Sequence, residues 1–169
     1  TVQGATELAN QMLALAKVEQ LRNQTDVPVV NWAEAVRTVA LDVSALVVDK
    51  QLDFDLNIQP VWVRAHEWTL KELARNLLHN AIRHTPEGGE LHITLEQDAE
   101  TGQGCLTIQD SGPGISAELK DRLFQPFATV SGALHGTGLG LSICHSIVQT
   151  LGGQIDLRNR KDTDPASKG

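Results

Sequence analysis

Three shortages in this chain each exclude a class of function. Lys and Arg number 14 against 21 Asp and Glu, so the formal net charge is −7 and no basic stripe can neutralise nucleic-acid phosphates. No apolar run approaches the roughly 20 residues that a membrane-spanning helix needs. The two cysteines, Cys105 and Cys144, lie inside apolar patterns without metal-site or redox spacing, so we expect buried thiols in a reducing compartment. The remaining composition, 169 residues of which 41% are apolar, is enough for one globular core.

The first predicted element is a helix that a polar connector separates from the rest of the chain. Leu8, Met12 and Leu15 recur at helical spacing between about residues 6 and 22. Residues 23–28 then form a polar connector that ends in a proline, and both features break a helix. The pattern leaves open whether this first helix is an appendage or packs on the domain that follows.

The rest of the chain is predicted to be one α/β unit, because segments of helical periodicity alternate with segments of period two. The expected elements are, in order, a strand at 29–30, a helix from about 31 to 50 capped by Asn31, a hairpin over 52–64 around Gln59-Pro60, a helix over 67–83, a hairpin over 91–108, a helix over 138–151 and a strand over 154–157. Strands joined by hairpins imply an α+β two-layer sandwich. Its sheet would be mixed and largely antiparallel, with about five strands and three helices on one face, beside the N-terminal helix.

The helix over 67–83 carries a polar stripe. At about 100° per residue, four polar side chains fall within an arc of roughly 80°: Glu72, Asn76, Asn80 and Arg83. The leucines of this helix lie on a separate arc that can face a core. Magnesium accepts oxygen ligands and shares its shell with substrate phosphates, and an asparagine carbonyl supplies such an oxygen without adding charge. A solvated helix face would explain this stripe equally simply if it stood alone.

Two glycine motifs follow this helix. Asp110-Ser-Gly-Pro-Gly114 ends a predicted strand, where a carboxylate can accept a hydrogen bond from an exocyclic amino group such as that of adenine, although a plain turn is equally consistent. Gly136, Gly138 and Gly140 free backbone N–H groups at the start of the last helix, where the helix dipole favours anions. A flexible loop or a helix cap would not explain three glycines at every second position that lead directly into the helix at Leu141.

Two other nucleotide folds do not fit the sequence. Gly112-Pro-Gly114-Ile-Ser-Ala117 matches the dinucleotide fingerprint, which requires an acidic residue about 20 positions later. No Asp or Glu occurs from Leu123 to Ile155, and a proline in the middle of the turn fits poorly. A P-loop is excluded because the sequence has no Gly-Lys-Ser or Gly-Lys-Thr.

Taken in order, these motifs resemble the ATP-binding catalytic domain of bacterial sensor histidine kinases, with the Bergerat fold shared by gyrase-type ATPases of the GHKL superfamily. The N box resembles residues 72–85, the G1 box residues 110–115, the F box Leu123-Phe-Gln-Pro-Phe127 and the G2 box residues 136–143. The resemblance covers about residues 29–157. It is specific because four boxes agree in order and spacing.

The resemblance implies a role for each motif. Asn80 would bind magnesium, with Asn76 beside it, and Asp110 would recognise the adenine amino group. Arg83 would reach the phosphates and form the catalytic set with the two asparagines, while His84 would lie near the base. Residues 125–137, anchored by Phe124 and Phe127, would form a lid over the phosphates. The remaining nucleotide contacts would come from Gly112, Gly114, Ile115, Phe127, Gly136, Thr137, Gly138, Leu139, Gly140 and Leu141.

The resemblance also implies the reaction, which is transfer of the γ-phosphate of Mg–ATP to a histidine for two-component signalling through a response regulator. In related ATPases of this fold, a glutamate at the position of Asn76 activates the attacking water. An amide cannot act as a general base, so transfer is favoured over hydrolysis. The alternative is a regulatory module that binds nucleotide without transferring phosphate.

The phosphoacceptor motif of these kinases is missing. The chain's one His-Glu pair, His66-Glu67, is followed by Trp-Thr-Leu and begins the N-box helix. The first helix instead resembles the end of the dimerisation hairpin, so we expect a fragment of the cytoplasmic part of an inner-membrane sensor that is a homodimer at full length. The expected divisions are 1–24 for the hairpin remnant, 25–28 for a linker, 29–160 for the catalytic domain and 161–169 for a disordered tail.

One departure from the family concerns the lid. The lid often carries a basic residue, but no Lys or Arg occurs between Leu123 and Leu157. The group that stabilises the γ-phosphate is therefore left open among Arg83, Arg122, Ser131, His135 and Thr137.

Overall fold

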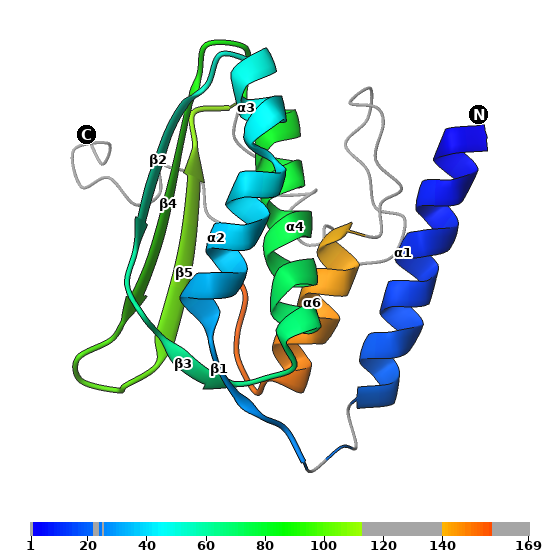
Figure 1. The fold of residues 1–169 in the computed structure, drawn as a ribbon, viewed down its shortest axis with the longest axis vertical. Helices are drawn as coiled ribbons and strands as arrows, with labels where there is room; N and C mark the ends of the chain where they lie inside the picture. The colour runs from blue at the N-terminus through cyan, green and yellow to red at the C-terminus, as the bar shows by residue number, and fades with distance from the viewer. Residues whose placement is uncertain (1, 22–23, 25, 113–139, 157–169) are drawn as a thin grey trace, which may run out of the picture.

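Helices cover one face of a small mixed sheet. The computed structural model describes residues 2–21, 24, 26–112 and 140–156. In chain order the described elements are α1 (Val2–Leu21), β1 (Val29–Asn31), α2 (Trp32–Asp42), α3 (Ser44–Asp49), β2 (Asp53–Ile58), β3 (Trp62–Arg64), α4 (Glu67–His84), β4 (Glu90–Gln97), β5 (Gly104–Asp110) and α6 (Gly140–Thr150). Figure 1 shows β2, β4 and β5 as one layer, with α2, α4 and α6 on one side of it and α1 beyond α6. This arrangement is the predicted α+β two-layer sandwich with an N-terminal helix.

The described strands form two sheets rather than one. β2 pairs in parallel with β4, β4 pairs antiparallel with β5, and β1 pairs antiparallel with β3. The hairpin predicted over 52–64 is therefore wrong, although both of its strands exist. Alternating apolar residues predict a strand but not the strand it pairs with. Here the chain passes through β3 and α4 after β2, and the next strand, β4, then pairs in parallel with β2. The hairpin predicted over 91–108 is confirmed by the antiparallel pairing of β4 with β5.

Two other predicted elements differ from the structure. The helix from 31 to 50 begins as predicted, with Asn31 Oδ1 accepting the Ala33 N–H at 3.1 Å, but it divides at Val43 into α2 and α3. At the division, the Ser44 hydroxyl donates to the backbone carbonyl of Leu41 at 2.7 Å. Serine is disfavoured inside helices because its hydroxyl competes in this way with the backbone N–H groups for carbonyl oxygens. The strand predicted over 154–157 is not present at residues 154–156, and Leu157 lies outside the described residues.

The inner face of the larger sheet forms the main core with the helices. Leu91, Ile93 and Leu95 of β4 are at most 1% exposed and belong to one cluster with Val39 of α2 and Leu78 of α4. Burying each such side chain contributes about 1.5–3 kcal/mol. This packing fixes α4, which carries the first predicted motif, against the sheet.

One of the two cysteines departs from the prediction that both thiols are buried. Cys144 is fully buried, and desolvation raises the pKa of its thiol. Cys105 is exposed, because it lies opposite Glu96 on the outer face of the sheet. The period-two pleat of β5 sends the next residue, Leu106, to the inner face instead, where it packs against the core.

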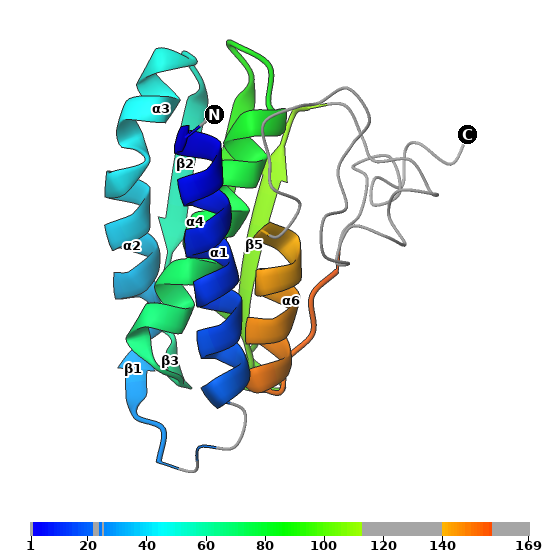
Figure 2. The same ribbon diagram turned by 90° about the vertical axis from the view of Figure 1, so that its right-hand side faces the viewer.

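The N-terminal helix packs on the domain that follows it. Val18 is fully buried in a cluster with Leu73 of α4 and Ile143 of α6. Lys17 Nζ lies 5.1 Å from the centroid of the Trp68 ring at the start of α4. Figure 2 shows α1 running along α4 and α6, on the side away from the sheet. Of the two arrangements that the sequence left open, the structure has the packed one. Among the described helices, none combines the length and the apolar content that crossing a membrane requires.

Candidate functional site

α4 carries the predicted polar stripe opposite its buried face. Leu73 and Leu78 are at most 3% exposed and anchor the helix in two different clusters. Asn76 and Asn80, one turn apart, are half-buried, and Arg83 is exposed in the last turn. The apolar positions therefore set the rotation of the helix, and that rotation places its amides where a ligand can reach them.

A local network orients the Asn76 amide. Its Nδ2 donates to Glu72 O at 2.8 Å and faces Glu72 Oε2 at 3.4 Å, while Arg75 Nη1 holds the same carboxylate at 2.8 Å. Because the NH₂ end is held within α4, the Asn76 carbonyl oxygen is left to point outward. A Cβ on Gly140 would lie 3.2 Å from that oxygen, closer than ordinary van der Waals contact. Glycine at this position therefore permits the first and third motifs to meet.

The place where they meet is the N-terminus of α6. Gly140 is the first residue of this 11-residue helix, and no acidic residue lies in its first turn. Ile143 and Ile147 are fully buried and fix α6 against α4. The first N–H groups of a helix have no partner within it, and the helix dipole adds positive potential there. Such an end favours an anion such as phosphate.

The second motif meets the C-terminal end of α4. The Gly112 N–H donates to Asp110 Oδ1 at 2.9 Å, which holds the carboxylate in a tight turn after β5. A Cβ on Gly112 would collide with the His84 carbonyl oxygen, so only glycine lets this turn lie against α4. Ser111 ties the turn to β4, donating its N–H to Glu90 O at 3.0 Å and accepting the Glu90 N–H on Oγ at 2.8 Å. Asp110 is thereby fixed beside the end of the N-box helix.

His84 presents a neutral imidazole to this region. Half burial lowers its pKa below the ordinary 6.5, the neighbouring Arg83 guanidinium lowers it further, and the Asp110 carboxylate acts in the opposite direction. The ring is therefore mostly uncharged at pH 7 and can pack against a base. His79, an exposed residue one position before Asn80, also has a lowered pKa, through partial desolvation of its ring and then the neighbouring Arg83 and Arg75 guanidinium groups.

Sequence reasoning missed Lys50, which lies just after α3. Its Nζ donates to the carbonyl oxygen of Ile82 at 2.5 Å and to that of Arg83 at 3.1 Å, in the last turn of α4. A lysine at the end of a predicted helix is typical of helix C-termini in general. The contact spans more than thirty positions, so no local pattern could have indicated it.

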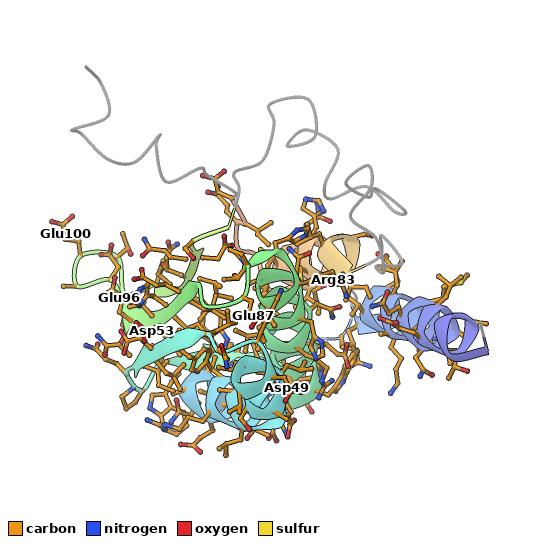
Figure 3. All side chains as sticks on the ribbon, turned by 90° about the horizontal axis from the view of Figure 1, so that it is seen from above. Asp49, Asp53, Arg83, Glu87, Glu96 and Glu100 are labelled. Carbon is orange, nitrogen blue, oxygen red and sulfur yellow. The ribbon has the colours of Figure 1, made fainter. Side chains whose placement is uncertain are left out.

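Arg83 and some of the acidic side chains lie on different sides of α4. Figure 3 shows Arg83 on the side of α4 that faces α6, whereas Asp53, Glu96 and Glu100 lie towards the sheet. An anion held beside Arg83 and the start of α6 would therefore lie away from these carboxylates.

Part of the predicted site lies outside the described residues: Gly114, Ile115, Phe127, Gly136, Thr137, Gly138 and Leu139, with the lid over 125–137, its anchor Phe124 and the phosphate candidates Arg122, Ser131 and His135. Within the described ranges, no group of three or more His, Cys, Asp or Glu side chains could hold a metal ion. An amide oxygen of α4 is a donor of the kind that magnesium accepts.

Comparison with known proteins decides the family. Residues 65–168 match the family model described as Histidine kinase-, DNA gyrase B-, and HSP90-like ATPase. The chain belongs to this family. The matched range includes α4, the Asp110 turn and α6, so it contains all three motifs.

The curated relatives are sensor proteins. The chain is 32% identical to Sensor protein kinase PmrB of Pseudomonas aeruginosa over 161 residues, which make up 93% of this chain and 33% of that protein. It is 29% identical to Sensor protein QseC of Escherichia coli (strain K12) over 158 residues, 92% of this chain and 34% of that protein. The chain thus spans about a third of the length of the curated relatives it matches.

Solved structures agree with this family. The catalytic domain of histidine kinase ThkA matches with a TM-score of 0.71 and 34% identity, over 80% of this chain and 89% of that one. Histidine kinase AdeS of Acinetobacter baumannii matches with a TM-score of 0.74 and 27% identity, over 94% of this chain and 74% of that one. The predicted fold and the predicted family are confirmed, and the domain is an ATP-binding catalytic domain of the sensor histidine kinase type. The roles of individual residues stay predictions.

Proposed function

We propose that this domain binds Mg–ATP along the polar side of α4 and donates the γ-phosphate to a histidine on a dimerisation domain outside this chain. One observation carries the proposal: the three motifs meet on one helix, where Asn76 faces Gly140 and His84 abuts Gly112. A polar helix face, a turn and a glycine loop each have a plain structural explanation when taken alone. Their convergence supports one ligand that extends from the Asp110 turn to the start of α6.

The base would lie at the Asp110 end. Asp110 Oδ1 already accepts the Gly112 N–H, and a carboxylate has further acceptor sites for the exocyclic amino group of adenine. The neutral, half-buried ring of His84 would pack beside the base. An acceptor at this position favours adenine over guanine, which carries a carbonyl where adenine carries the amino group.

The phosphates would lie towards the start of α6. Asn80, half-buried one turn beyond Asn76, would supply an oxygen to magnesium, which when bound neutralises phosphate charge. The N–H groups of the first α6 turn and the exposed Arg83 guanidinium would face the same phosphates. Asn76 would direct its carbonyl oxygen into this region rather than bind the metal itself.

Asn76 also supports transfer over hydrolysis. An amide cannot take a proton from water, so this position offers no general base for hydrolysis. Its NH₂ group already donates to the Glu72 carbonyl oxygen at 2.8 Å, which supports a role in positioning the ligand. Phosphoryl transfer depends mainly on positioning and charge neutralisation, and both are features of this arrangement.

The partners of this domain would be those of a sensor kinase. Histidine kinase ThkA, whose complex with the response regulator protein TrrA matches this chain at a TM-score of 0.68 and 28% identity, supports a response regulator as partner. Residues 1–24 would belong to the second helix of a dimerisation hairpin, residues 25–28 to a linker and residues 29–160 to the catalytic domain. The full-length protein would be a homodimeric inner-membrane sensor with this domain in the cytoplasm.

The test uses ATP labelled on the γ-phosphate. The chain alone should bind Mg–ATP yet neither label itself nor release phosphate at more than a trace rate, because Asn76 is no base and none of the six histidines lies in an acceptor motif. Adding a separate dimerisation hairpin that carries the acceptor histidine should transfer label to the hairpin. The control is the same hairpin with that histidine replaced by alanine.

Three results would contradict the proposal. Robust labelling of the chain alone would mean that it contains an acceptor. Rapid release of phosphate would identify a hydrolase. Binding of Mg–ATP without label on the hairpin would favour a regulatory nucleotide-binding module.

A further inference from the structure

Lys50 is tied to α4 from two directions. Its side-chain ammonium donates to the carbonyl oxygens of Ile82 and Arg83. Its own backbone carbonyl accepts the Gly88 N–H at 3.0 Å, just beyond the end of α4. The next residue, Gln51, has a φ of 54°, the left-handed conformation that turns the chain towards β2. Lys50 is therefore a half-buried clamp on the end of α4 rather than a mobile surface lysine.

Two other carbonyl groups at this end of α4 have different neighbours. The Ala81 carbonyl accepts the N–H of Thr85 at 3.0 Å and its hydroxyl at 2.6 Å. The His84 carbonyl lies against Gly112, in the turn that carries Asp110. The last four carbonyls of a helix have no partner within it, so each needs one from outside.

Lys50 supplies a donor to two of these last carbonyls, those of Ile82 and Arg83. Without it, both would lose their protein donor in the turn that carries the Arg83 side chain. The ammonium also compensates the negative end of the α4 dipole. The Lys50 side chain thus fixes the position of the last turn of α4 and also offsets the partial negative charge at this end of the helix.

We propose that Lys50 is a positioning residue of the nucleotide site, whose ammonium holds the last turn of α4 so that Arg83 and His84 keep their places beside a bound nucleotide. This inference rests on the proposed function, because it assumes that nucleotide lies there. Lys50 acts through carbonyl groups and not by touching the ligand. It lies outside the four boxes by which the domain was recognised.

The test compares Lys50→Met, Lys50→Gln and Lys50→Arg with the unchanged chain by calorimetric titration of Mg–ATP. Lys71→Met is the matched control, because Lys71 pairs with Glu67 at 3.1 Å on the surface of the same helix. Titrations are made where circular dichroism shows every variant folded. We expect Lys50→Met to weaken binding about tenfold, and Lys50→Arg and Lys71→Met to stay within about twofold.

A second measurement reports on the charge rather than on stability. The Lys50 ammonium is among the groups that lower the pKa of His84, after burial and Arg83. Titration of His84 by NMR should therefore show a raised pKa in Lys50→Met and Lys50→Gln, and an unchanged one in Lys50→Arg and Lys71→Met. If Lys50→Met does not fold, Lys50→Gln carries the same two expectations, with a smaller loss of affinity.

The outcomes separate this inference from the proposed function. A folded Lys50→Met or Lys50→Gln with unchanged affinity and unchanged His84 titration overturns the positioning role, as does a loss of affinity that Lys50→Arg fails to rescue. Asp110→Ala reports on the site itself. If Asp110→Ala weakens ATP binding while the Lys50 variants do not, only the role of Lys50 is wrong. If the unchanged chain binds no nucleotide, the proposed function fails as well.

Discussion

Asn76 and Asn80 are the same amino acid one turn apart on α4, yet they would serve the site differently. The NH₂ end of Asn76 is engaged by Glu72, so its carbonyl oxygen is turned towards Gly140 at the start of α6. Asn80 lies nearer to Arg83 and to the Asp110 end of the helix. The contacts of Asn76 support it as the residue that shapes the phosphate region, and the magnesium role of Asn80 stays a prediction.

The role of Asn80 leads to a prediction that depends on the metal. Asn80→Ala should weaken ATP binding about tenfold in magnesium and less than about twofold in EDTA, because the lost oxygen matters only when the ion is bound. Calorimetric titration under both conditions measures this difference. Asn57→Ala, on the exposed outer face of β2, is the matched control. Equal losses in magnesium and in EDTA would show that Asn80 has only a structural role.

At the scale of the elements, α1 relies on tertiary contacts. It has no acidic residue in its first turn and no basic residue in its last, so neither end compensates the helix dipole. Its contact with the domain includes the buried Val18, the partly buried Leu8 and Leu15 of the same cluster, and Lys17 over Trp68. A helix without end compensation relies on such packing for its stability.

The packing of α1 can be tested with a pair of substitutions in the same helix. Val18→Ala should lower the free energy of unfolding by about 1.5–3 kcal/mol, because it removes two buried methyl groups and leaves a cavity. Leu13→Ala should change it by less than about 0.5 kcal/mol, because Leu13 is 65% exposed. Urea denaturation of the three proteins measures both values. Equal effects from the two substitutions would mean that α1 does not pack on α4 and α6 in solution.

The molecule as a whole should lose stability in mild acid. The pKa values of His79 and His84 are both lowered from 6.5 in the folded chain, chiefly by partial desolvation of their rings. Between the folded pKa and 6.5 the unfolded chain binds more protons, so stability rises with pH there and is lost as pH falls through the folded pKa.

Urea denaturation at about pH 7.5 and at about pH 5.5 measures this loss. The variant with both His79→Gln and His84→Gln should lose less stability between these two conditions than the unchanged chain. Carboxylates titrate in both proteins, so the difference between the two losses isolates the histidines. If the losses are the same, the lowered pKa values of these histidines do not control stability in this range.

The family and the local elements that carry the site follow from short stretches of neighbouring residues. The polar stripe of α4, the Asp110 turn and the glycine at the start of α6 are each encoded within a few residues, and their order is specific to one family. Helical and strand periods likewise depend on neighbours close in the chain, so α4, β4, β5 and the Asn31 cap were predicted correctly.

Which of these elements meet depends on contacts between residues far apart in the chain. Periodicity says which face of a strand is apolar but not which edge it pairs, so β2 could be assigned to β4 only in the folded chain. The same limit applied to Cys105, whose exposure depends on the outer sheet face being left uncovered by helices. It applied most fully to Lys50, because a hydrogen bond across 32 positions leaves no pattern in the residues on either side of it.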